Sequence, residues 1–195
     1  MKFQVSPEAF FQINVPATEI LYSMVADLVN ATSSATVLDV CCGTGTISLC
    51  LAKSGAKVIG IEMCPEAVEN AKLNAENNNL PNVEFICGKA EDVIYTALSK
   101  CGTSEIIAVV DPPRAGLHPK VLKVLRGTTK IQKLIYISCH PDAAFTNFIG
   151  LCRTSSNNYK GSPFYPVQAM VVDMFPYTPH KELVMVFERI DNLQT

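Results

Sequence analysis

The sequence has little net charge and no long apolar run, and both absences limit the surfaces it can form. Its 195 residues carry 16 Lys and Arg against 18 Asp and Glu, a net charge of -2. This balance argues against a large basic nucleic-acid-binding surface within the chain. No apolar stretch is long enough to span a bilayer, and the first residues lack the apolar core of a signal peptide. We therefore expect no membrane partner.

Metal-binding cysteine motifs are also missing. None of the eight cysteines forms a Cys-x-x-Cys pair, so a zinc cluster is not expected and we predict no metal site. Several cysteines lie inside apolar strand or helix patterns, as buried thiols do in a reducing compartment. We expect an intracellular protein, with the cytoplasm or nucleus favoured over the mitochondrion.

The length and the 48% hydrophobic content suit one globular domain with a substantial core. After a helical lead-in over residues 1–35, strand and helix patterns alternate five times. The expected strands are 36–41, 57–62, 83–87, 105–111 and 132–138. Two further strands, 165–174 and 182–189, are joined by a link too short for a crossover helix, so they should be antiparallel. The pattern predicts an α/β, doubly wound, mostly parallel seven-stranded sheet with an antiparallel C-terminal hairpin.

A glycine-rich turn follows the first strand and predicts a nucleotide-type cofactor site. Gly43 and Gly45 allow a tight turn and a close approach to a ligand. The next helix would aim free N–H groups at that ligand. Asp39 could accept a hydrogen bond from its ammonium or hydroxyl groups. Glu62, at the end of the second strand, suits a carboxylate that grips both hydroxyls of an adenosine ribose.

The turn does not match a nicotinamide-binding pattern, because Ser48 stands where a third glycine would be. Asp39 and the Asp111-Pro112-Pro113 turn after the fourth strand fit S-adenosylmethionine better. An aromatic residue after those prolines would favour methylation of an amino group. Arg114 stands there instead and weakens that interpretation.

Cys139 follows the fifth strand, and Pro141 is placed as the first residue of the next helix. A helix N-terminus favours a thiolate, so this residue is a candidate nucleophile. His140 could be a hydrogen-bond partner or a helix cap, and its role stays open.

A thiolate beside a methyl donor indicates chemistry at carbon 5 of uracil. That carbon is a poor nucleophile until a thiolate adds to carbon 6, and a base must later remove the carbon-5 proton. Asp173 and Glu182 compete for the role of base. We favour Glu182, because the proline-stiffened loop before it would overhang the cleft.

The chain resembles the S-adenosylmethionine-dependent RNA uracil-5-methyltransferases, and most of all the animal tRNA (uracil-5-)-methyltransferases. The resemblance covers nearly the whole chain and lies in five stretches: Ser6-Pro-Glu-Ala-Phe-Phe-Gln-Ile-Asn14, Asp39 to Gly45, Asp111-Pro-Pro-Arg-Ala-Gly116, Ile137-Ser-Cys-His-Pro141 and Asp173-Met-Phe-Pro-Tyr-Thr-Pro-His-Lys-Glu182. It implies a Rossmann-like methyltransferase fold and methyl transfer to uridine in RNA, with the T-loop uridine of tRNA as the target.

The resemblance also implies site residues. Cys139 matches the family nucleophile and Glu182 the proton acceptor. The matched cofactor-binding positions are Gln12, Cys41, Thr46, Glu62 and Asp111. Bacterial members typically have an aromatic residue at position 41 and Asn at position 46.

Full-length relatives carry RNA-binding modules before this region, so residues 1–195 resemble a single catalytic domain. We expect this domain to bind S-adenosylmethionine but to bind tRNA weakly, because most phosphate contacts would lie elsewhere. Two alternatives stay open: an amino-group methyltransferase that uses the Asp-Pro-Pro turn, and a non-catalytic cofactor- or RNA-binding module.

Overall fold

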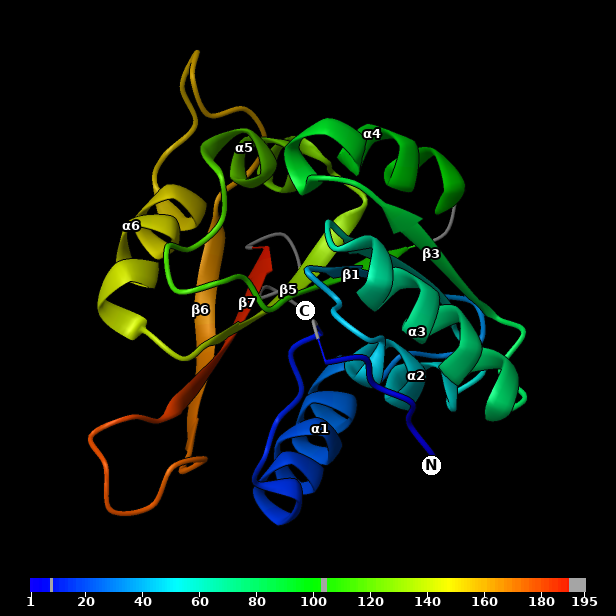
Figure 1. Ribbon diagram of the computed structural model, residues 1–195. Coiled ribbons are helices and arrows are strands. Elements are labelled where there is room, and N and C mark those ends of the chain that lie inside the picture. Colours follow the sequence, from blue (N-terminus) through cyan, green and yellow to red (C-terminus); the bar gives the residue numbers. More distant parts are fainter. Residues whose placement is uncertain (8, 103–104, 190–195) are drawn as a thin grey trace.

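The computed structural model describes residues 1–7, 9–102 and 105–189, which form one seven-stranded sheet with helices on both faces (Figure 1). The strands are β1 (Thr36–Val40), β2 (Lys57–Glu62), β3 (Val83–Cys87), β4 (Ile106–Val110), β5 (Ile131–Ser138), β6 (Phe164–Val172) and β7 (Glu182–Arg189). The helices are α1 (Val15–Val29), α2 (Thr46–Ala52), α3 (Pro65–Asn77), α4 (Ala90–Lys100), α5 (Pro119–Gly127) and α6 (Pro141–Cys152).

The sheet has the order β3-β2-β1-β4-β5-β7-β6. Strands β1 to β5 pair in parallel, and β7 pairs antiparallel with both β5 and β6. The predicted parallel sheet with an antiparallel C-terminal hairpin is therefore confirmed. The strand order reverses between β1 and β4, and ligands bind at such a switch point in open α/β sheets.

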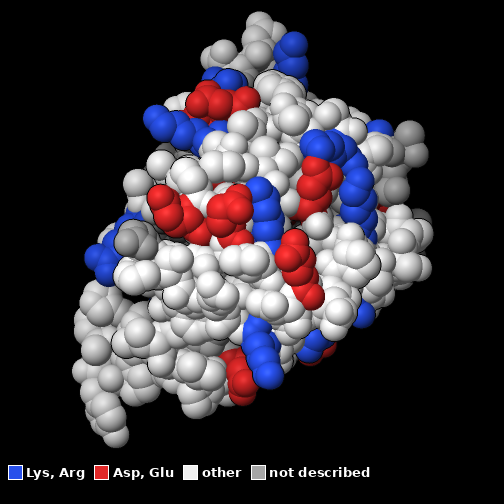
Figure 2. Space-filling model, turned by 45° about the vertical axis from the view of Figure 1, so that its right-hand side comes forward, with Lys and Arg blue, Asp and Glu red and all other residues white. Residues whose placement is uncertain are grey.

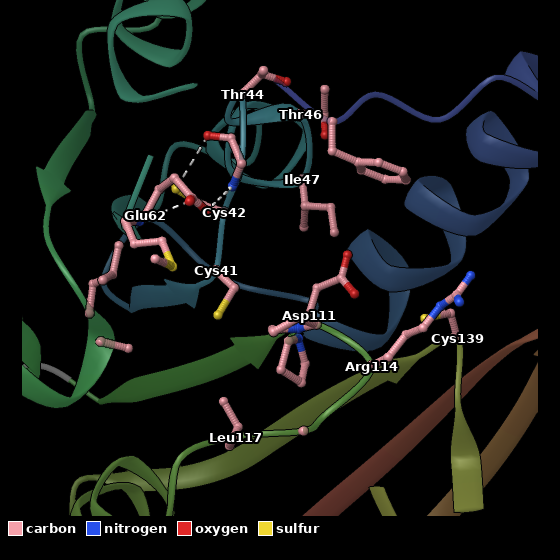
Figure 3. Close-up of a pocket in the computed structure, with 18 of the residues that line it drawn as sticks. Cys41, Cys42, Thr44, Thr46, Ile47, Glu62, Asp111, Arg114, Leu117 and Cys139 are labelled. Atoms are coloured by element: carbon pink, nitrogen blue, oxygen red, sulfur yellow. Dashed lines mark hydrogen bonds between the residues drawn. The ribbon is translucent and has the colours of Figure 1, made fainter. Parts of the chain in front are cut away.

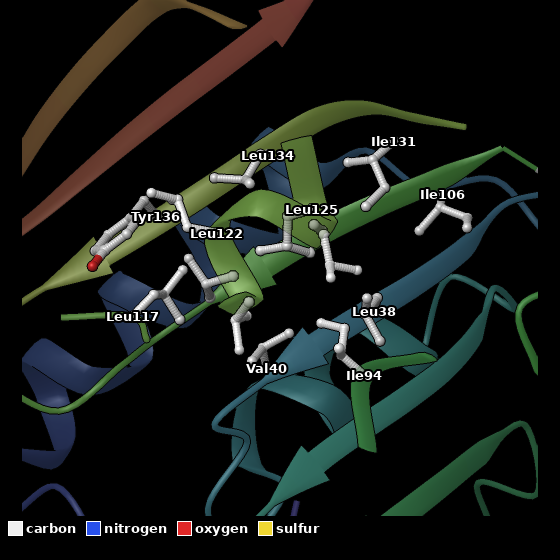
Figure 4. Packing of buried hydrophobic residues seen from close by; sticks show 14 of the residues in the cluster. Leu38, Val40, Ile94, Ile106, Leu117, Leu122, Leu125, Ile131, Leu134 and Tyr136 are labelled. Carbon is white, nitrogen blue, oxygen red and sulfur yellow. The ribbon is translucent and has the colours of Figure 1, made fainter. Parts of the chain in front are cut away.

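Two apolar layers hold the helices on the sheet, because the parallel strands are buried on both faces. Helices α4, α5 and α6 pack on one face, where Leu38 and Val40 of β1 meet Ile94 of α4 (Figure 4). Helices α1 and α2 pack on the other face, where Val37 and Val109 are fully buried. A smaller cluster beside this second layer attaches α3 through Phe85 of β3.

Most element boundaries fall within two residues of the predicted ones. Helix α1 begins at Val15, because the Asn14 side chain accepts the Ala17 N–H and Pro16 lies in the first turn. Strand β4 ends at Val110, one residue earlier than predicted, so Asp111 lies in the turn beyond the strand. Strand β6 ends at Val172, so Asp173 also lies in a loop.

Gly45 and Gly60 are needed for packing against Phe85. A Cβ added at Gly45 would lie 2.8 Å from the Phe85 ring, and one added at Gly60 would lie 2.6 Å from it. Gly45 was expected to let a ligand approach the backbone. The side of Gly45 that would carry a Cβ instead faces the protein interior. There the Phe85 ring packs β3 against the start of α2.

We expect Gly60→Ala to destabilise the fold by about 1–3 kcal/mol, because the methyl group must displace the Phe85 ring in a packed core. Thermal and denaturant unfolding would measure the loss. Gly127→Ala is the matched control, since nothing lies within 4 Å of a Cβ there and it should not destabilise. Adding Phe85→Leu to Gly60→Ala should restore part of the loss, and a purely additive double variant would contradict the proposed clash.

Candidate active site

A cavity of about 740 Å³ lies at the carboxyl ends of the parallel strands (Figure 3). Its volume falls within the range of small-molecule sites. Its wall brings together the glycine turn after β1, the turn after β4, the end of β5 and the start of β7. Eight of the ten predicted site residues line it: Gln12, Cys41, Gly43, Thr46, Glu62, Asp111, Cys139 and Glu182. Asp39 and Gly45 are not among the lining residues.

The glycine turn and Glu62 form one hydrogen-bonded unit. Gly43 has φ +53°, and a Cβ built there would meet nothing within 4 Å, so its backbone is open to the cavity. Its N–H donates to Oε2 of Glu62 at 3.0 Å (Figure 3). The N–H groups of Met63 and Cys64 donate to Oε1. A carboxylate offers about four acceptor positions. Glu62 is therefore fixed in place and can still accept a hydroxyl hydrogen bond.

Asp39 lies beneath the turn and is fully buried. Oδ2 of its carboxylate accepts the Ser48 hydroxyl at 2.6 Å. Burial raises the pKa of Asp39 to about 6, and the charge of Glu62 adds to the shift. At this buried position Asp39 is suited to support the turn. That it also contacts a ligand stays a prediction. Ser48, which replaces the third glycine of the nicotinamide pattern, supplies that support.

Cys139 and Glu182 come to the same cavity through strand pairing. Strand β7 runs antiparallel to β5, with Leu183 opposite Ser138, the last residue of β5. Glu182 precedes Leu183 and Cys139 follows Ser138, so the pairing brings both residues to the same end of the two strands. Both residues line the cavity, and the charge of Glu182 raises the pKa of Cys139. The structure thus gathers a thiol and a carboxylate in one cavity, although 43 positions separate them in the sequence.

The thiol of Cys139 is disfavoured as an anion. Burial raises its pKa, the charges of Glu182 and Asp111 raise it further, and the Arg114 guanidinium lowers it. Desolvation and two nearby carboxylates thus act against the thiolate, whereas the expected stabilisation by the helix N-terminus stays a prediction. His140 has a structural partner: its Nδ1 accepts the Ala143 N–H at 3.2 Å and caps α6.

Glu182 is 4% exposed, and its Oε2 has no hydrogen-bond partner among the described residues. Burial raises the pKa of this carboxyl group. The competing acid, Asp173, is exposed, accepts the Phe175 N–H at 3.2 Å and is not part of the cavity wall. The position of Glu182 is the one expected for a base that acts inside the cavity.

Asp111 completes the acidic side of the cavity. Burial raises its pKa well above the usual range, and the charges of Glu182 and Asp39 raise it further. Carboxylates that raise one another's pKa are stabilised by a cation placed between them. The cavity is therefore electrostatically suited to a positively charged ligand.

Tyr22 is a cavity residue that the sequence did not single out. It projects from α1, lines the cavity, and its hydroxyl accepts a 3.1 Å hydrogen bond from Thr46 Oγ1. Burial raises the pKa of this phenol, so it stays neutral. The sequence signal was a polar-tipped aromatic residue within the apolar stripe of a helix, a position that usually indicates core packing.

Two asparagines of α3, Asn70 and Asn74, and its C-cap residue Asn78 form a second feature that sequence reasoning missed. They stand four residues apart, so they share one face of the helix. Asn78 and Asn74 each exchange two hydrogen bonds with the backbone of the N-terminal segment, at Lys2 and Gln4 respectively. Asn70 donates to the Ser6 hydroxyl at 2.7 Å. Because residues 10–12 line the cavity, this asparagine ladder fixes the segment that brings Gln12 to it.

Asn74 also joins the ladder to the glycine turn, since its Nδ2 donates to the Thr44 carbonyl at 3.2 Å. Its side chain is fully buried. One amide group therefore holds the N-terminal segment and the cofactor turn together.

Side-chain charges are mixed outside the cavity. On the face shown in Figure 2, Lys and Arg are interspersed with Asp and Glu, so the described residues of that face form no continuous basic patch. A search of the described residues found no cluster of three His, Cys, Asp or Glu side chains able to hold a metal ion. In the same part of the chain, no helix combines the length and apolar character of a membrane span.

We predict that Asn74→Ala lowers the free energy of unfolding by about 1–3 kcal/mol, because it leaves the polar groups of Gln4 and Thr44 without their buried partner. It should also speed proteolytic cleavage in residues 1–14. Asn77→Ala, at an exposed position of the same helix, is the control and should change stability by less than about 0.5 kcal/mol. Unchanged cleavage in Asn74→Ala would show that the ladder does not hold the segment.

The charges around Cys139 predict opposite shifts in two variants. Glu182→Gln removes a charge that raises the Cys139 pKa, so alkylation by iodoacetamide should begin at lower pH. Arg114→Gln removes a charge that lowers it, so alkylation should begin at higher pH. Peptide mass spectrometry across a pH series would follow Cys139, with Cys152 as the internal reference. Shifts of the same sign in both variants would contradict this electrostatic account.

Comparison with known proteins agrees with this geometry. The family model described as tRNA (uracil-5-)-methyltransferase matches residues 1–190. Among curated proteins, tRNA (uracil-5-)-methyltransferase homolog A of Homo sapiens is 51% identical over 98% of this chain and 31% of its own length. Homolog B of Homo sapiens is 44% identical over 97% of this chain and 38% of its own length.

Among solved structures, the tRNA (uracil-54, C5)-methyltransferase of Pyrococcus abyssi, in complex with S-adenosyl-L-homocysteine, matches with a TM-score of 0.76 and 31% identity. The match covers 95% of this chain and 41% of that protein. The chain thus spans roughly a third of the length of the curated relatives it matches. By sequence and by fold, it belongs to the tRNA (uracil-5-)-methyltransferase family.

Proposed function

We propose that this chain is the catalytic domain of an enzyme that transfers a methyl group from S-adenosyl-L-methionine to carbon 5 of a uridine in tRNA. One observation carries the proposal. A thiol, Cys139, and a carboxylate, Glu182, line the same cavity as the glycine turn and Glu62, and the charge of Glu182 acts on the Cys139 thiol. These are the two groups that methylation of a pyrimidine at carbon 5 requires.

The residues of the cavity fit the cofactor. Glu62 retains acceptor capacity for a ribose hydroxyl, and Gly43 presents its backbone without a side chain. The paired hydroxyls of Tyr22 and Thr46, with Gln12, provide polar groups for the amino-acid part. When bound, the cofactor supplies a methyl group on a positively charged sulfur. Asp111 would lie near that charge, and its raised pKa is the response expected of a carboxylate that lacks a cationic partner.

Cys139 acts first on the uracil ring. Its thiolate adds to carbon 6, and the electrons of the carbon 5–carbon 6 double bond move onto the oxygen at carbon 4. The resulting enolate makes carbon 5 nucleophilic enough to take the methyl group. Because Glu182 and Asp111 raise the pKa of Cys139, a cationic ligand that offsets their charge would also favour the thiolate.

Glu182 completes the reaction as general base. It takes the proton from carbon 5, the double bond to carbon 6 forms again, and the bond between carbon 6 and sulfur breaks to release the thiolate. Burial raises the pKa of Glu182, and a higher pKa makes its carboxylate a stronger base. Oε2 is free of other hydrogen bonds among the described residues.

We extend the proposal to the T-loop uridine of tRNA as the substrate. The Pyrococcus abyssi relative is a tRNA (uracil-54, C5)-methyltransferase, and both human relatives are tRNA (uracil-5-)-methyltransferase homologs. The net charge of -2 leads us to expect weak tRNA binding by residues 1–195 alone. The assay below therefore uses a high RNA concentration and low salt.

Incubation with S-adenosylmethionine and tRNA that contains 5-fluorouridine tests the mechanism. Fluorine replaces the proton that Glu182 must remove, so the adduct should persist, and mass spectrometry should locate it on Cys139. Cys139→Ala should form no adduct and should not methylate ordinary tRNA. Glu182→Gln should accumulate the adduct on ordinary tRNA, because proton removal is blocked.

The alternatives predict other results. Methylation that survives in Cys139→Ala would support amino-group chemistry at the Asp-Pro-Pro turn and would overturn the proposed mechanism. A chain that shows no cofactor binding in calorimetry would be a non-catalytic module.

A further inference from the structure

Tyr177 occupies a backbone conformation that tyrosine rarely adopts. It is the third residue of a turn in which the Thr178 N–H donates to the Phe175 carbonyl at 3.1 Å, with Pro176 at the second position. Its φ is +67°. Proline followed by a residue of positive φ is the type II turn pattern, in which glycine is usual at the third position. A bulky side chain there is strained, and such strain is characteristic of functional sites.

Packing of the Tyr177 side chain does not explain why this strained conformation is kept. Its relative exposure is 108%, so both faces of the ring are open to solvent. The conformation is therefore maintained by the loop and not by contacts of the ring.

Hydrogen bonds along residues 173–180 hold the turn rigid. Thr178 Oγ1 donates to the Phe175 carbonyl at 2.7 Å and accepts the His180 N–H at 3.2 Å. At the base of the loop, Asn14 Nδ2 donates to the Met174 carbonyl at 3.0 Å. The ring of Tyr177 is thus presented on a stiff support, which lowers the entropy lost when it binds a partner.

The turn stands at the edge of the candidate active site. Phe175, His180 and Glu182 line the cavity, and Tyr177 lies between the first two in the chain. Lys181, four positions after Tyr177 in the chain, is exposed. An exposed aromatic ring in a loop that also carries an exposed lysine, at the edge of a cavity that would receive a uracil, suits a single-stranded nucleic acid.

We propose that Tyr177 stacks on an unpaired RNA base that neighbours the uridine entering the cavity. This inference rests on the proposed function. A nucleotide must leave its stack for its ring to reach the pair Cys139 and Glu182, and its neighbours then lose a stacking partner. The ring of Tyr177 replaces that partner, because RNA recognition in loops commonly stacks splayed bases on aromatic side chains.

Fluorescence anisotropy of a labelled T-arm hairpin RNA, titrated with the chain at low salt, tests the inference. Tyr177→Phe keeps the aromatic face and should bind like the unchanged chain. Tyr177→Leu keeps apolar bulk without the aromatic face and should raise Kd roughly five- to hundredfold, the size expected for loss of one stacked base. Tyr95→Leu is the matched control, because Tyr95 is 62% exposed on α4 and is not a cavity residue.

Tyr177→Gly separates binding from folding. Glycine adopts positive φ without strain, so this variant should unfold at the same temperature or higher while its Kd for RNA rises as in Tyr177→Leu. A lower unfolding temperature would show that the ring serves stability and would overturn the inference.

The two proposals fail differently. If the 5-fluorouridine adduct forms on Cys139 but Tyr177→Leu binds the hairpin like the unchanged chain, the stacking role is wrong and the catalytic proposal stands. If no adduct forms but Tyr177→Leu selectively weakens RNA binding, the catalytic proposal is wrong. An equal loss in Tyr177→Phe and Tyr177→Leu would indicate a hydroxyl contact, and no RNA binding by the unchanged chain would also overturn stacking.

Discussion

The antiparallel pairing of β7 with β5 is the constraint on which the candidate site depends. A parallel strand added at this edge would bring its carboxyl end to the cavity, as the other strands do. Because β7 runs the other way, its first residue, Glu182, reaches the cavity that Cys139, the residue after β5, also lines. The C-terminal hairpin therefore does more than extend the sheet, because its direction brings an acid to the cavity of the candidate nucleophile.

The fold brings three acidic side chains together at buried positions in and beneath the cavity. Asp39, Asp111 and Glu182 all have raised pKa values, with burial as the largest cause for each. Burial and the neighbouring carboxylates also raise the pKa of Cys139. Without a ligand, the ionised forms of these groups are disfavoured by burial and by one another. A positively charged ligand would favour them. A cation bound in the cavity would offset this electrostatic cost.

Much of the fold could be predicted because strand period, glycine turns and proline positions are local signals. These signals predicted the parallel strands and the short link before β7. They also predicted the carboxyl ends of the strands, where Glu62, Asp111 and Cys139 lie. The pKa of Cys139 could not be read locally, because it depends on carboxylates brought close by tertiary structure. The inward direction of Gly45 was likewise missed, because it is set by Phe85, forty residues later.

The asparagines of α3 show why the remaining site residues were missed. In sequence, Asn70, Asn74 and Asn78 belong to a polar, helix-compatible stretch, and such residues are usually solvated. Their partners are backbone groups of Lys2 and Gln4, which carry no side-chain signature of the contact. Since residues 2–4 belong to no helix or strand and have no period of their own, the signal lay in the four-residue spacing of the asparagines. The cavity wall around Gln12 therefore depends on hydrogen bonds between asparagine side chains and backbone groups. The side chains can be read from the sequence, but their backbone partners cannot.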